Sequence, residues 1–363
     1  MKILIVKTSA IGDVIHTLPA LNCLRRHYPE ARIDWLVEEA ASEAVIGHRA
    51  VDRVLVSRRK SWIKFIKSGR FLAAGRDFYR LWHDLRATRY DLLIDFQGLL
   101  KSGIFVFGAR ARRKVGFGPG MEHAEASWLF LNERLPPVAM DQHAIQRELQ
   151  LLAAIGIPCQ DVVFDFPVRD EDQNQVRWLL AKLGADPSEP MVAINPLTTW
   201  PTKHWLNERF AEVADRLGEM GVKVVFTGGL GEAPVIAEKI IASMRHRDKA
   251  INLAGRTSLK ELAALYGMIQ AVITTDTGPM HVAAAVGTPV VALFGPTAPW
   301  RTGPYGDKHR VLRAGLACSP CFKRECQHKT NECMLDITVD DLFIIAVKLI
   351  SYNYTSSYNV HHL

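Results

Sequence analysis

The stretch ITTDTGPMHVAAAVGTPVVALFGP, residues 273–296, decides the fold of the chain around it. Its apolar start stops at Asp276, a Thr-Gly-Pro turn leads into the small residues 280–286, and a second apolar run covers 290–294. This order predicts a strand, a loop, a short helix and a parallel strand. Pro279 suits the first turn of that helix, where its missing N–H has no partner to lose.

The beginning of this predicted helix is a candidate anion site. Unpaired backbone N–H groups there carry roughly half a unit of positive charge and point to the carboxyl edge of the strands, where a pyrophosphate would be stabilised. The alternative is an ordinary buried crossover helix whose first turn is simply capped. The pattern alone is compatible with both interpretations.

Length and composition indicate the size, the expected partners and the cellular setting of the protein. A chain of 363 residues with 48% hydrophobic residues is large enough to bury the cores of two domains. A net charge of +7 favours anionic partners, whether nucleotides, phosphorylated glycans, an acidic membrane surface or nucleic acid. The N-terminus opens on KILIVK without the features of a signal peptide, and no apolar run reaches 18 residues. We therefore expect a soluble, cytoplasmic protein.

The first 39 residues predict one strand-helix-strand unit. A continuous apolar run covers residues 3–6, apolar residues at helical spacing follow Gly12, and a second apolar run covers 33–37. The intervening turn, TSAIGD, lacks the order G-x-G-x-x-G. A dinucleotide-binding function is therefore disfavoured for this unit.

Residues 58–90 form a basic stretch that carries ten Arg and Lys residues interleaved with aromatic side chains. An amphipathic basic helix of this kind can rest on an anionic interface or line a cleft for an acidic acceptor. An ordinary surface helix packed through its aromatic residues is an equally good interpretation. A buried strand follows at 92–96, and Lys101 lies just beyond its end, where open α/β sheets place ligand-binding groups.

The second half of the chain repeats the architecture of the first after a linker. The linker begins at Pro158 and includes VVFDFPV, which predicts an edge strand ending in Pro167. Five apolar runs, MVAIN, VKVVFTG, INLAG, AVITTD and PVVALFG, then alternate with helical patterns. This alternation predicts an α/β protein with doubly wound parallel sheets. The predicted helices cover residues 206–220, 232–244, 258–269 and 279–286, followed by a last helix at about 339–350.

Three motifs in this order resemble the lipopolysaccharide heptosyltransferases of glycosyltransferase family 9. They are KTSAIGDVIHTLPAL, NPLTTWPTKHW and TDTGPMHVAAAVGTPVVALFGPT, and the resemblance covers roughly residues 1–315. It implies the GT-B architecture, in which two Rossmann-like domains face each other across a cleft. Residues 1–168 would be the acceptor-binding domain, residues 169–350 the nucleotide-sugar-binding domain, and residues 351–363 a flexible tail.

The resemblance also implies a reaction. Heptose would pass from ADP-heptose to an anionic acceptor in the lipopolysaccharide inner core, either Kdo or heptose, with inversion and without a metal ion. The enzyme would work at the cytoplasmic surface of the inner membrane as a peripheral protein. We expect no nucleic acid partner, because the chain has no recognised RNA-binding motif.

The donor site implied by the resemblance combines a cation, hydroxyls and backbone N–H groups. Such groups stabilise the negative charge that develops on a departing diphosphate. Without the resemblance, Lys203 would be more simply read as a surface lysine, and Asp276 as a helix cap. The implied donor-binding residues are Thr198, Thr199, Lys203, Asp276, Thr277, Gly278, Met280 and His281, with Asp276 beside the heptose.

Asp13 is the candidate general base. An inverting transfer needs one carboxylate beside the acceptor hydroxyl, and this contribution is worth about 10²- to 10⁴-fold in rate. Because Asp13 opens a helix, it could instead act only as a cap worth about 1 kcal/mol. The family resemblance favours catalysis, because its catalytic aspartate falls on Asp13. The implied acceptor-binding residues are Arg58, Arg59, Lys60, Lys101 and His143.

Four cysteines close to the C-terminus suggest a structural role. Four thiolates within sixteen residues can form a closed zinc site, although only one C-x-x-C pair is present. Reduced or disulfide-paired cysteines are the alternative, and no cofactor is expected for catalysis. The four residues are Cys318, Cys321, Cys326 and Cys333.

Two other functions are compatible with the same motifs. A non-catalytic nucleotide-sugar-binding protein would keep Lys203 and the loop at Thr277 without needing Asp13. A family 9 transferase could also use another sugar or another acceptor. Substitution of Asp13 separates an enzyme from a binding protein, because only an enzyme would lose turnover while it keeps its affinity for the donor.

Overall fold

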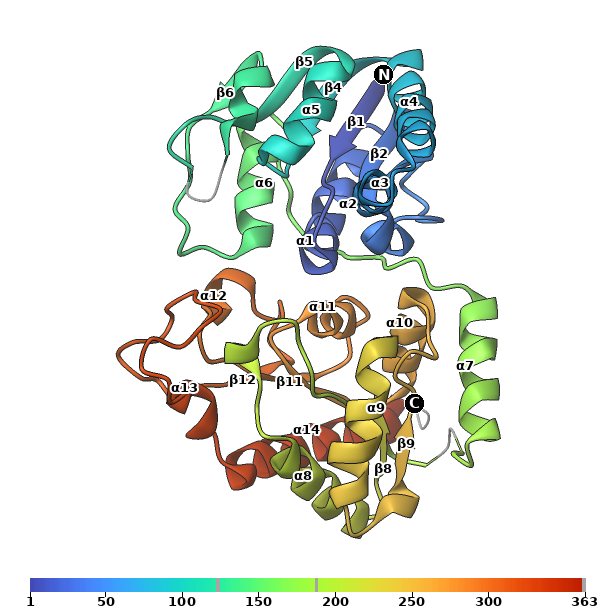
Figure 1. Ribbon diagram of the computed structural model, residues 1–363, viewed down its shortest axis with the longest axis vertical. Coiled ribbons are helices and arrows are strands. Elements are labelled where there is room, and N and C mark those ends of the chain that lie inside the picture. Colours follow the sequence, from blue (N-terminus) through green and yellow to red (C-terminus); the bar gives the residue numbers. More distant parts are fainter. Residues whose placement is uncertain (122–124, 187–188, 361–363) are drawn as a thin grey trace. The chain divides into compact units, whose positions relative to one another are not determined.

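The computed structural model describes residues 1–121, 125–186 and 189–360 of the chain. Two compact units divide the chain between Pro167 and Val168. Each unit has a six-stranded, entirely parallel sheet with helices packed on it (Figure 1). Among the described residues, no helix combines the length and the apolar character that crossing a bilayer requires.

The first unit is organised around strand β1, which lies in the middle of its sheet. The strand order is β3-β2-β1-β4-β5-β6, so β1 pairs with β2 on one side and β4 on the other. The apolar run at residues 3–6 is completely buried, as a central parallel strand requires. The strands are β1 (Lys2–Val6), β2 (Arg32–Glu38), β3 (Arg53–Ser57), β4 (Arg89–Asp95), β5 (Arg110–Phe117) and β6 (Glu133–Leu135).

The helices of the first unit follow the strands in the order expected for a doubly wound sheet. Side chains from α3, α4 and α5 join Leu4, Val6 and Leu93 of the sheet in one hydrophobic core. The helices are α1 (Ile11–His16), α2 (Leu18–His27), α3 (Arg59–Lys67), α4 (Phe71–Ala87), α5 (Leu100–Gly108) and α6 (Ala144–Ala154), with 3₁₀ turns η1 (Glu39–Ala44) and η2 (Ala126–Phe130).

The second unit repeats this plan around β10. The strand order is β12-β11-β10-β7-β8-β9. Side chains of α8 and α14 pack with Ile194, Ile273 and Leu293 of the sheet in its core. The strands are β7 (Met191–Asn195), β8 (Lys223–Phe226), β9 (Ala250–Asn252), β10 (Ala271–Thr275), β11 (Val290–Leu293) and β12 (Arg310–Leu312).

The helices of the second unit agree with the helical patterns of the sequence at most positions. They are α7 (Asp170–Lys182), α8 (Asn207–Glu219), α9 (Ala233–Val235), α10 (Leu259–Met268), α11 (Gly278–Ala285), α12 (Pro299–Thr302), α13 (Glu332–Leu335) and α14 (Val339–Val360). Short turns of other helix types are η3 (Pro201–Lys203), η4 (Leu230–Glu232), η5 (Ile236–Ile240), η6 (Ile241–Ser243) and η7 (Arg247–Lys249).

The structure corrects three predictions about these elements. The segment 162–168 is not an edge strand, because Asn22 on α2 donates side-chain hydrogen bonds to the carbonyls of Val163 and Phe164 at 2.7 and 3.3 Å. The predicted helix 232–244 is broken into α9 and short turns of π and 3₁₀ type. Helix α14 ends at Val360 and not at about residue 350; the flexibility of residues 351–363 stays a prediction, and residues 361–363 lie outside the described residues.

A disulfide adds a covalent link within the first unit. It joins Cys23 on α2 to Cys159, 136 residues further along the chain. The same segment is also held by the Asn22 hydrogen bonds to Val163 and Phe164. The chain that leaves the first unit is thus fastened to α2 at two places.

Candidate active site

Asp13 lies in the first turn of α1, just beyond the carboxyl end of the central strand β1. The backbone N–H of Ala10 donates to Asp13 Oδ2 at 2.9 Å, so this residue does cap its helix. That bond uses one of the two carboxylate oxygens, and the side chain is partly exposed. Capping and a catalytic role are therefore compatible at this position.

A buried ion pair lies within electrostatic range of Asp13. Lys7 Nζ is 2.7 Å from Glu148 Oε1, and Thr17 Oγ1 donates to the same oxygen at 3.0 Å. Burial lowers the pKa of Lys7, but the carboxylates of Glu148 and Asp13 outweigh it, so the pKa is raised. Burial also raises the pKa of Glu148, against the opposing effect of Lys7. The positive charge of Lys7, paired with Glu148, thus interacts electrostatically with the candidate base.

Lys7 and Glu148 were missed in the sequence, although a signal was present. Glu148 falls on the apolar face of its helix with Ile145, Leu149 and Leu152, all of which are buried. A carboxylate on such a face requires a cationic partner, because an unpaired buried charge is costly. The partner could not be chosen from the sequence, since it lies 141 positions away.

Two of the predicted acceptor-binding residues lie at the carboxyl edge of the first sheet. Glu38, at the end of β2, accepts from Arg59 Nε at 3.0 Å and lies 3.6 Å from Lys101 Nζ. Lys101 also donates to the hydroxyl of Ser9, in the loop that leads from β1 to Asp13. Arg59 and Lys101 therefore meet at one edge of the sheet, as its topology requires.

The other predicted acceptor residues are placed differently. Arg58 is paired with Glu39 at 3.2 Å and with Asp77 of α4 at 3.7 Å, and Lys60 is exposed on α3. His143 caps α6, and its ring packs edge to face against His16 of α1 with centroids 5.1 Å apart. His143 therefore lies beside the helix that carries Asp13.

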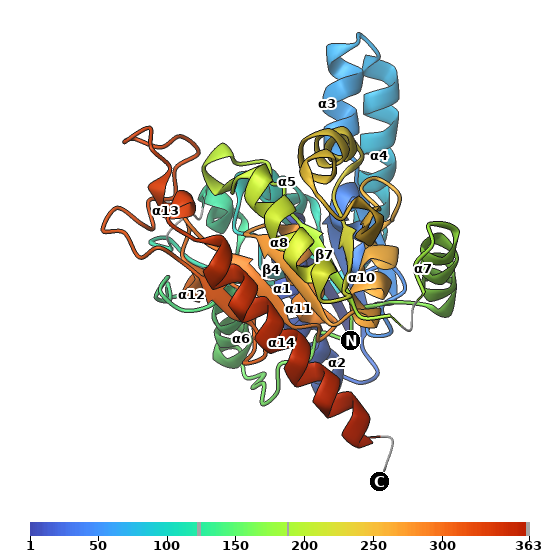
Figure 2. The same cartoon turned by 90° about the horizontal axis from the view of Figure 1, so that it is seen from below.

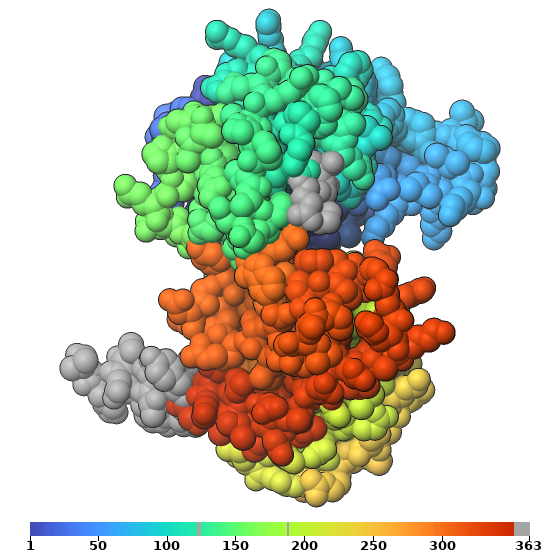
Figure 3. All heavy atoms as spheres, turned by 90° about the vertical axis from the view of Figure 1, so that its left-hand side faces the viewer, coloured from blue at the N-terminus to red at the C-terminus, as the bar shows by residue number. Residues whose placement is uncertain are grey.

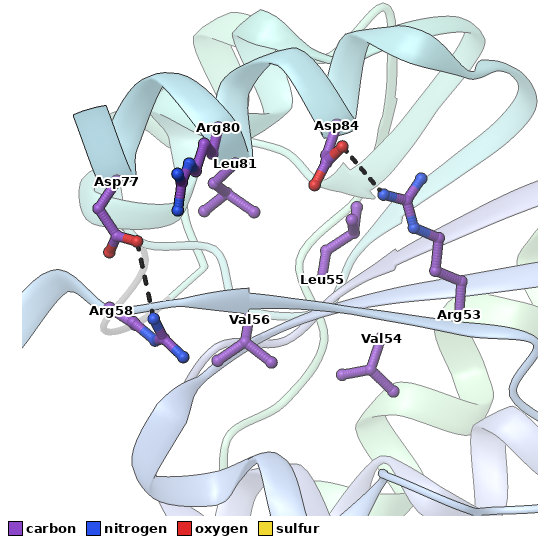
Figure 4. A pocket seen from close by; sticks show the side chains of 9 residues that line it. All are labelled: Arg53, Val54, Leu55, Val56, Arg58, Asp77, Arg80, Leu81 and Asp84. Atoms are coloured by element: carbon purple, nitrogen blue, oxygen red, sulfur yellow. Dashed lines mark ion pairs between the residues drawn. The ribbon is translucent and has the colours of Figure 1, made fainter. Parts of the chain in front are cut away.

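A small pocket lies between β3 and α4, close to Arg58. Its volume is about 180 Å³, and Arg58 and Arg80 line one end of it (Figure 4). Arg53 and Asp84 form an ion pair of 3.2 Å at the other end. The pocket is too small for a sugar nucleotide, and Asp13 is not among the residues that line it.

In the second unit, the predicted cation and the predicted carboxylate form a pair. Lys203 Nζ lies 2.6 Å from Asp276 Oδ2, with only 13% and 8% of the two side chains exposed. Thr297 donates to the same Asp276 oxygen at 2.6 Å. Lys203 is in the turn that follows β7, and Asp276 directly follows β10, so the pairing of these two strands brings the residues together.

The Lys203 ammonium group also rests on an aromatic ring. It lies 4.6 Å from the ring centroid of Trp200, and the guanidinium of Arg324 lies 5.1 Å from the same centroid. A cation above an indole face is favourable by about 0.5–2 kcal/mol. Trp200 thus helps to gather two positive charges beside the loop that carries Thr198 and Thr199.

Helix α11 begins directly after Asp276, with Thr277 as its N-cap residue in extended conformation. The N–H of Met280 donates to the carbonyl of Thr277 at 3.1 Å, so it is already engaged within the first turn. The predicted backbone donors Gly278 and His281 lie in the same first turn of α11, and their role at the donor stays a prediction. Lys203 and the start of α11 are therefore adjacent, and together they can hold an anion.

The structure does not support a zinc site at the four cysteines. Over the described ranges, no group of three or more His, Cys, Asp or Glu side chains is arranged to hold a metal ion. The four thiols are free: Cys318 is exposed, and Cys333 is buried on α13. Burial, with the neighbouring thiols, raises the pKa of Cys333. Their loop contacts the turn that carries Lys203, because Thr202 donates to the carbonyl of Lys323 at 2.8 Å.

Known proteins resemble this chain over most of its length. Residues 78–331 match the family model described as glycosyltransferase family 9 (heptosyltransferase). Lipopolysaccharide heptosyltransferase 1 of Pseudomonas aeruginosa is 36% identical, over 92% of this chain and 89% of its own. These matches span most of the chain, both of its units included.

Solved structures of a second relative show the same fold. The Escherichia coli heptosyltransferase WaaC with ADP is 27% identical and covers 96% of this chain and 100% of its own, with a TM-score of 0.75. The same enzyme with ADP-2-deoxy-2-fluoro heptose covers 96% of this chain and 99% of its own, with a TM-score of 0.73. The predicted GT-B class of two Rossmann-like units is confirmed. The chain therefore belongs to glycosyltransferase family 9, the heptosyltransferase family, and is a glycosyltransferase.

Proposed function

We propose that this enzyme transfers a heptose from ADP-heptose to the inner core of lipopolysaccharide, with inversion at the anomeric carbon and without a metal ion. The observation that carries the proposal is the pairing of Lys203 with Asp276 at the start of α11. Relatives named lipopolysaccharide heptosyltransferase 1, and a relative solved with ADP and with an ADP-heptose analogue, support the substrates.

The second unit is proposed to hold the donor. The β-phosphate of ADP gains negative charge as its bond to the sugar breaks, and Lys203 with the N–H groups of Gly278 and His281 stabilises that charge. Thr198 and Thr199 bind the phosphates through the loop that precedes Lys203. Thr277 and Met280 belong to the turn that lies against these phosphates.

Asp276 is proposed to act on the sugar side of the same site. Its carboxylate can accept a hydrogen bond from a heptose hydroxyl while it keeps Lys203 in position. This role explains why a carboxylate stands beside an anion site, where it would otherwise repel the phosphates. The hydroxyl of Thr297 fixes the orientation of Asp276.

The first unit is proposed to bind the acceptor and to take its proton. Asp13 removes the proton of the attacking hydroxyl, that oxygen forms a bond to the anomeric carbon, and the bond from that carbon to the diphosphate breaks. ADP departs with the electron pair, and the single displacement inverts the anomeric carbon. Because the pKa of Lys7 is raised, its ammonium group stays charged near Asp13 throughout the reaction.

The acceptor is proposed to be the acidic keto-sugar of the inner core. Arg59 and Lys101 offer positive charge at the edge that carries Asp13, and His143 lies beside α1. Arg58 and Lys60 extend this positive charge toward α4. We also propose that the enzyme works at the cytoplasmic surface of the inner membrane, where a lipid-linked acceptor of this kind is presented.

The test is substitution of Asp13 in the purified enzyme. Asp13→Asn keeps an oxygen that can accept the hydrogen bond from Ala10, so the helix cap is retained. We expect turnover with ADP-heptose and acceptor to fall about 10²- to 10⁴-fold, while ADP affinity measured by calorimetry stays within about twofold. Turnover close to that of the unsubstituted enzyme would refute the role of Asp13 as the base.

A further inference from the structure

The helical hairpin of α3 and α4 stands out from the first unit, with residues 68–70 as its turn (Figure 2). Its base is firmly anchored, because Leu81 and Leu85 belong to the core beneath the sheet. The buried ring of Trp62 donates through Nε1 to Asp77 Oδ2 at 2.6 Å, and this bond clamps α3 to α4. The hairpin is therefore a fixed element that presents the side chains at its turn.

Apolar side chains are exposed at this turn. Leu72 and Phe71, in the first turn of α4, are 90% and 64% exposed, and Ile63 and Ile66 of α3 are 40% and 49% exposed. The light-blue lobe in Figure 3 is this hairpin. Single exposed apolar residues are ordinary, but four within residues 63–72 of one projecting hairpin indicate an interaction surface, which we call the apolar patch.

The charged residues of the segment that carries this patch have one sign. Residues 59–76 contain six Arg and Lys residues and no Asp or Glu. Lys64 and Lys67 flank the exposed isoleucines on α3, and Arg70, in the turn, lies over the ring of Phe65 at 4.9 Å. Cations with long aliphatic stems beside an apolar patch match a surface that is negative outside and apolar beneath.

An anionic lipid bilayer has this layered chemistry. A projecting turn can enter the interface of a bilayer, because lipids move aside around it. An acidic protein partner would satisfy the cations, but it would need a groove shaped for the apolar turn. The exposure of Leu72 on a convex end of the hairpin therefore favours the bilayer.

We propose that the turn of the α3–α4 hairpin docks this enzyme on an anionic bilayer. Phe71 and Leu72 insert among the acyl chains, and Lys64, Lys67 and Arg70 bind lipid phosphates. The inference rests on the proposed function only for the identity of the membrane, because a lipid-linked acceptor is found there. Docking by this element would hold the first unit, which carries Asp13, at the surface that presents the acceptor.

The experiment measures partition of the full-length protein onto sedimented vesicles in the absence of sugar nucleotide. We expect binding to phosphatidylcholine vesicles with 30% phosphatidylglycerol, and much weaker binding to phosphatidylcholine alone. Phe71→Ser/Leu72→Ser should weaken partition by at least about tenfold. Lys67→Gln/Arg70→Gln should weaken it by about 30-fold at low salt.

A matched control replaces exposed apolar residues elsewhere. Trp178 and Met220 are 53% and 52% exposed in the second unit, and Trp178→Ser/Met220→Ser should leave partition unchanged. Equal binding to both vesicle types, or equal losses in the control, would overturn the proposal. Binding that needs only the cations and tolerates Phe71→Ser/Leu72→Ser would also overturn it, because the apolar turn would then take no part in docking.

A second readout separates this inference from the proposed function. With a water-soluble, delipidated acceptor, Phe71→Ser/Leu72→Ser should keep the turnover of the unsubstituted enzyme. Asp13→Asn should bind vesicles normally but lose turnover. Failure of docking and failure of the transfer reaction would therefore appear in different assays.

Discussion

Lys203 Nζ and Asp276 Oδ2 lie 2.6 Å apart in a largely buried ion pair at the start of α11. Two strands that are neighbours in the sheet, β7 and β10, deliver these residues from positions 73 residues apart. The pair couples a cation suited to a diphosphate with a carboxylate suited to a sugar hydroxyl. If the pair holds the donor as proposed, stability and donor binding depend on the same two side chains.

Lys203→Met should affect both properties. Removing one partner of a buried pair leaves the Asp276 carboxylate uncompensated, so we expect the free energy of unfolding to fall by about 3 kcal/mol. ADP affinity should fall about 10- to 100-fold, because a charged hydrogen bond to phosphate is lost. Urea unfolding and calorimetry with ADP measure the two effects.

The double variant Lys203→Met/Asp276→Asn provides the control for that prediction. It removes both charges and keeps an acceptor for Thr297, so most of the stability should return while ADP affinity stays low. Recovery of ADP affinity together with stability would show that Lys203 acts only through folding. The nucleotide role assigned to Lys203 would then be wrong.

Glu148→Gln should destabilise the first unit by about 3 kcal/mol, because Lys7 would be left buried without an anionic partner. Lys7→Met/Glu148→Leu should recover more than half of this loss. Glu133→Gln is a suitable comparison, since Glu133 forms a 2.8 Å pair with Arg113 that is about 40% exposed. Its effect on urea unfolding should stay below about 1 kcal/mol. Equal losses in the two single variants would contradict this account.

His309 should make the protein less stable in mild acid. Burial lowers the pKa of His309 to about 4, and its Nε2 lies 3.1 Å from the carbonyl of Tyr305. Because the unfolded chain binds a proton near pH 6.5 and the folded protein does not, stability falls as the pH drops from 6.5 to 4. The loss amounts to at most about 3 kcal/mol.

His309→Gln tests this assignment. Glutamine can donate to the Tyr305 carbonyl but cannot gain a proton in this range. Urea unfolding of the variant should therefore depend less on pH between 6.5 and 4 than that of the unsubstituted protein. An unchanged slope would mean that other groups cause the acid sensitivity.

Reduction of the Cys23–Cys159 disulfide should lower the stability of the first unit. The bond closes a loop of 136 residues, and loss of such a crosslink costs about 2–5 kcal/mol. We expect thermal unfolding to begin at a lower temperature after treatment with a reductant. Cys23→Ser/Cys159→Ser should already unfold at the lower temperature, with no further response to reductant. The four free thiols serve as an internal control in that variant.

Much of the fold follows from local patterns in the sequence. The apolar runs at residues 3–6 and 271–275 predicted the central strands of both sheets, and both are buried there. The family resemblance selected Asp13 and Asp276, and each of them follows a strand of its own sheet, at the edge where open α/β sheets place ligand-binding groups. The last predicted helix likewise begins at Val339, where the Asp341 N–H donates to Thr338 Oγ1 at 3.1 Å and caps the first turn.

The features that were missed depend on contacts between distant residues. Segment 162–168 has the composition of a strand. The Asn22 side chain, however, donates hydrogen bonds to backbone carbonyls that would pair with a neighbouring strand in a sheet. The pairing of Lys7 with Glu148 and the disulfide of Cys23 join positions more than 130 residues apart. Local spacing contains no information about such partners. Glu148 lies among apolar residues on one face of its helix. This position is the signal in the sequence from which a buried carboxylate could have been predicted.

The indole of Trp200 provides this enzyme with an intrinsic optical probe. Lys203 and Arg324 both lie against its ring, so its excited state is sensitive to the position of two charges. When a diphosphate draws Lys203 toward itself, the emission of Trp200 should change, and Trp200→Phe should abolish that part of the signal. Donor binding can then be followed in real time on the unlabelled protein.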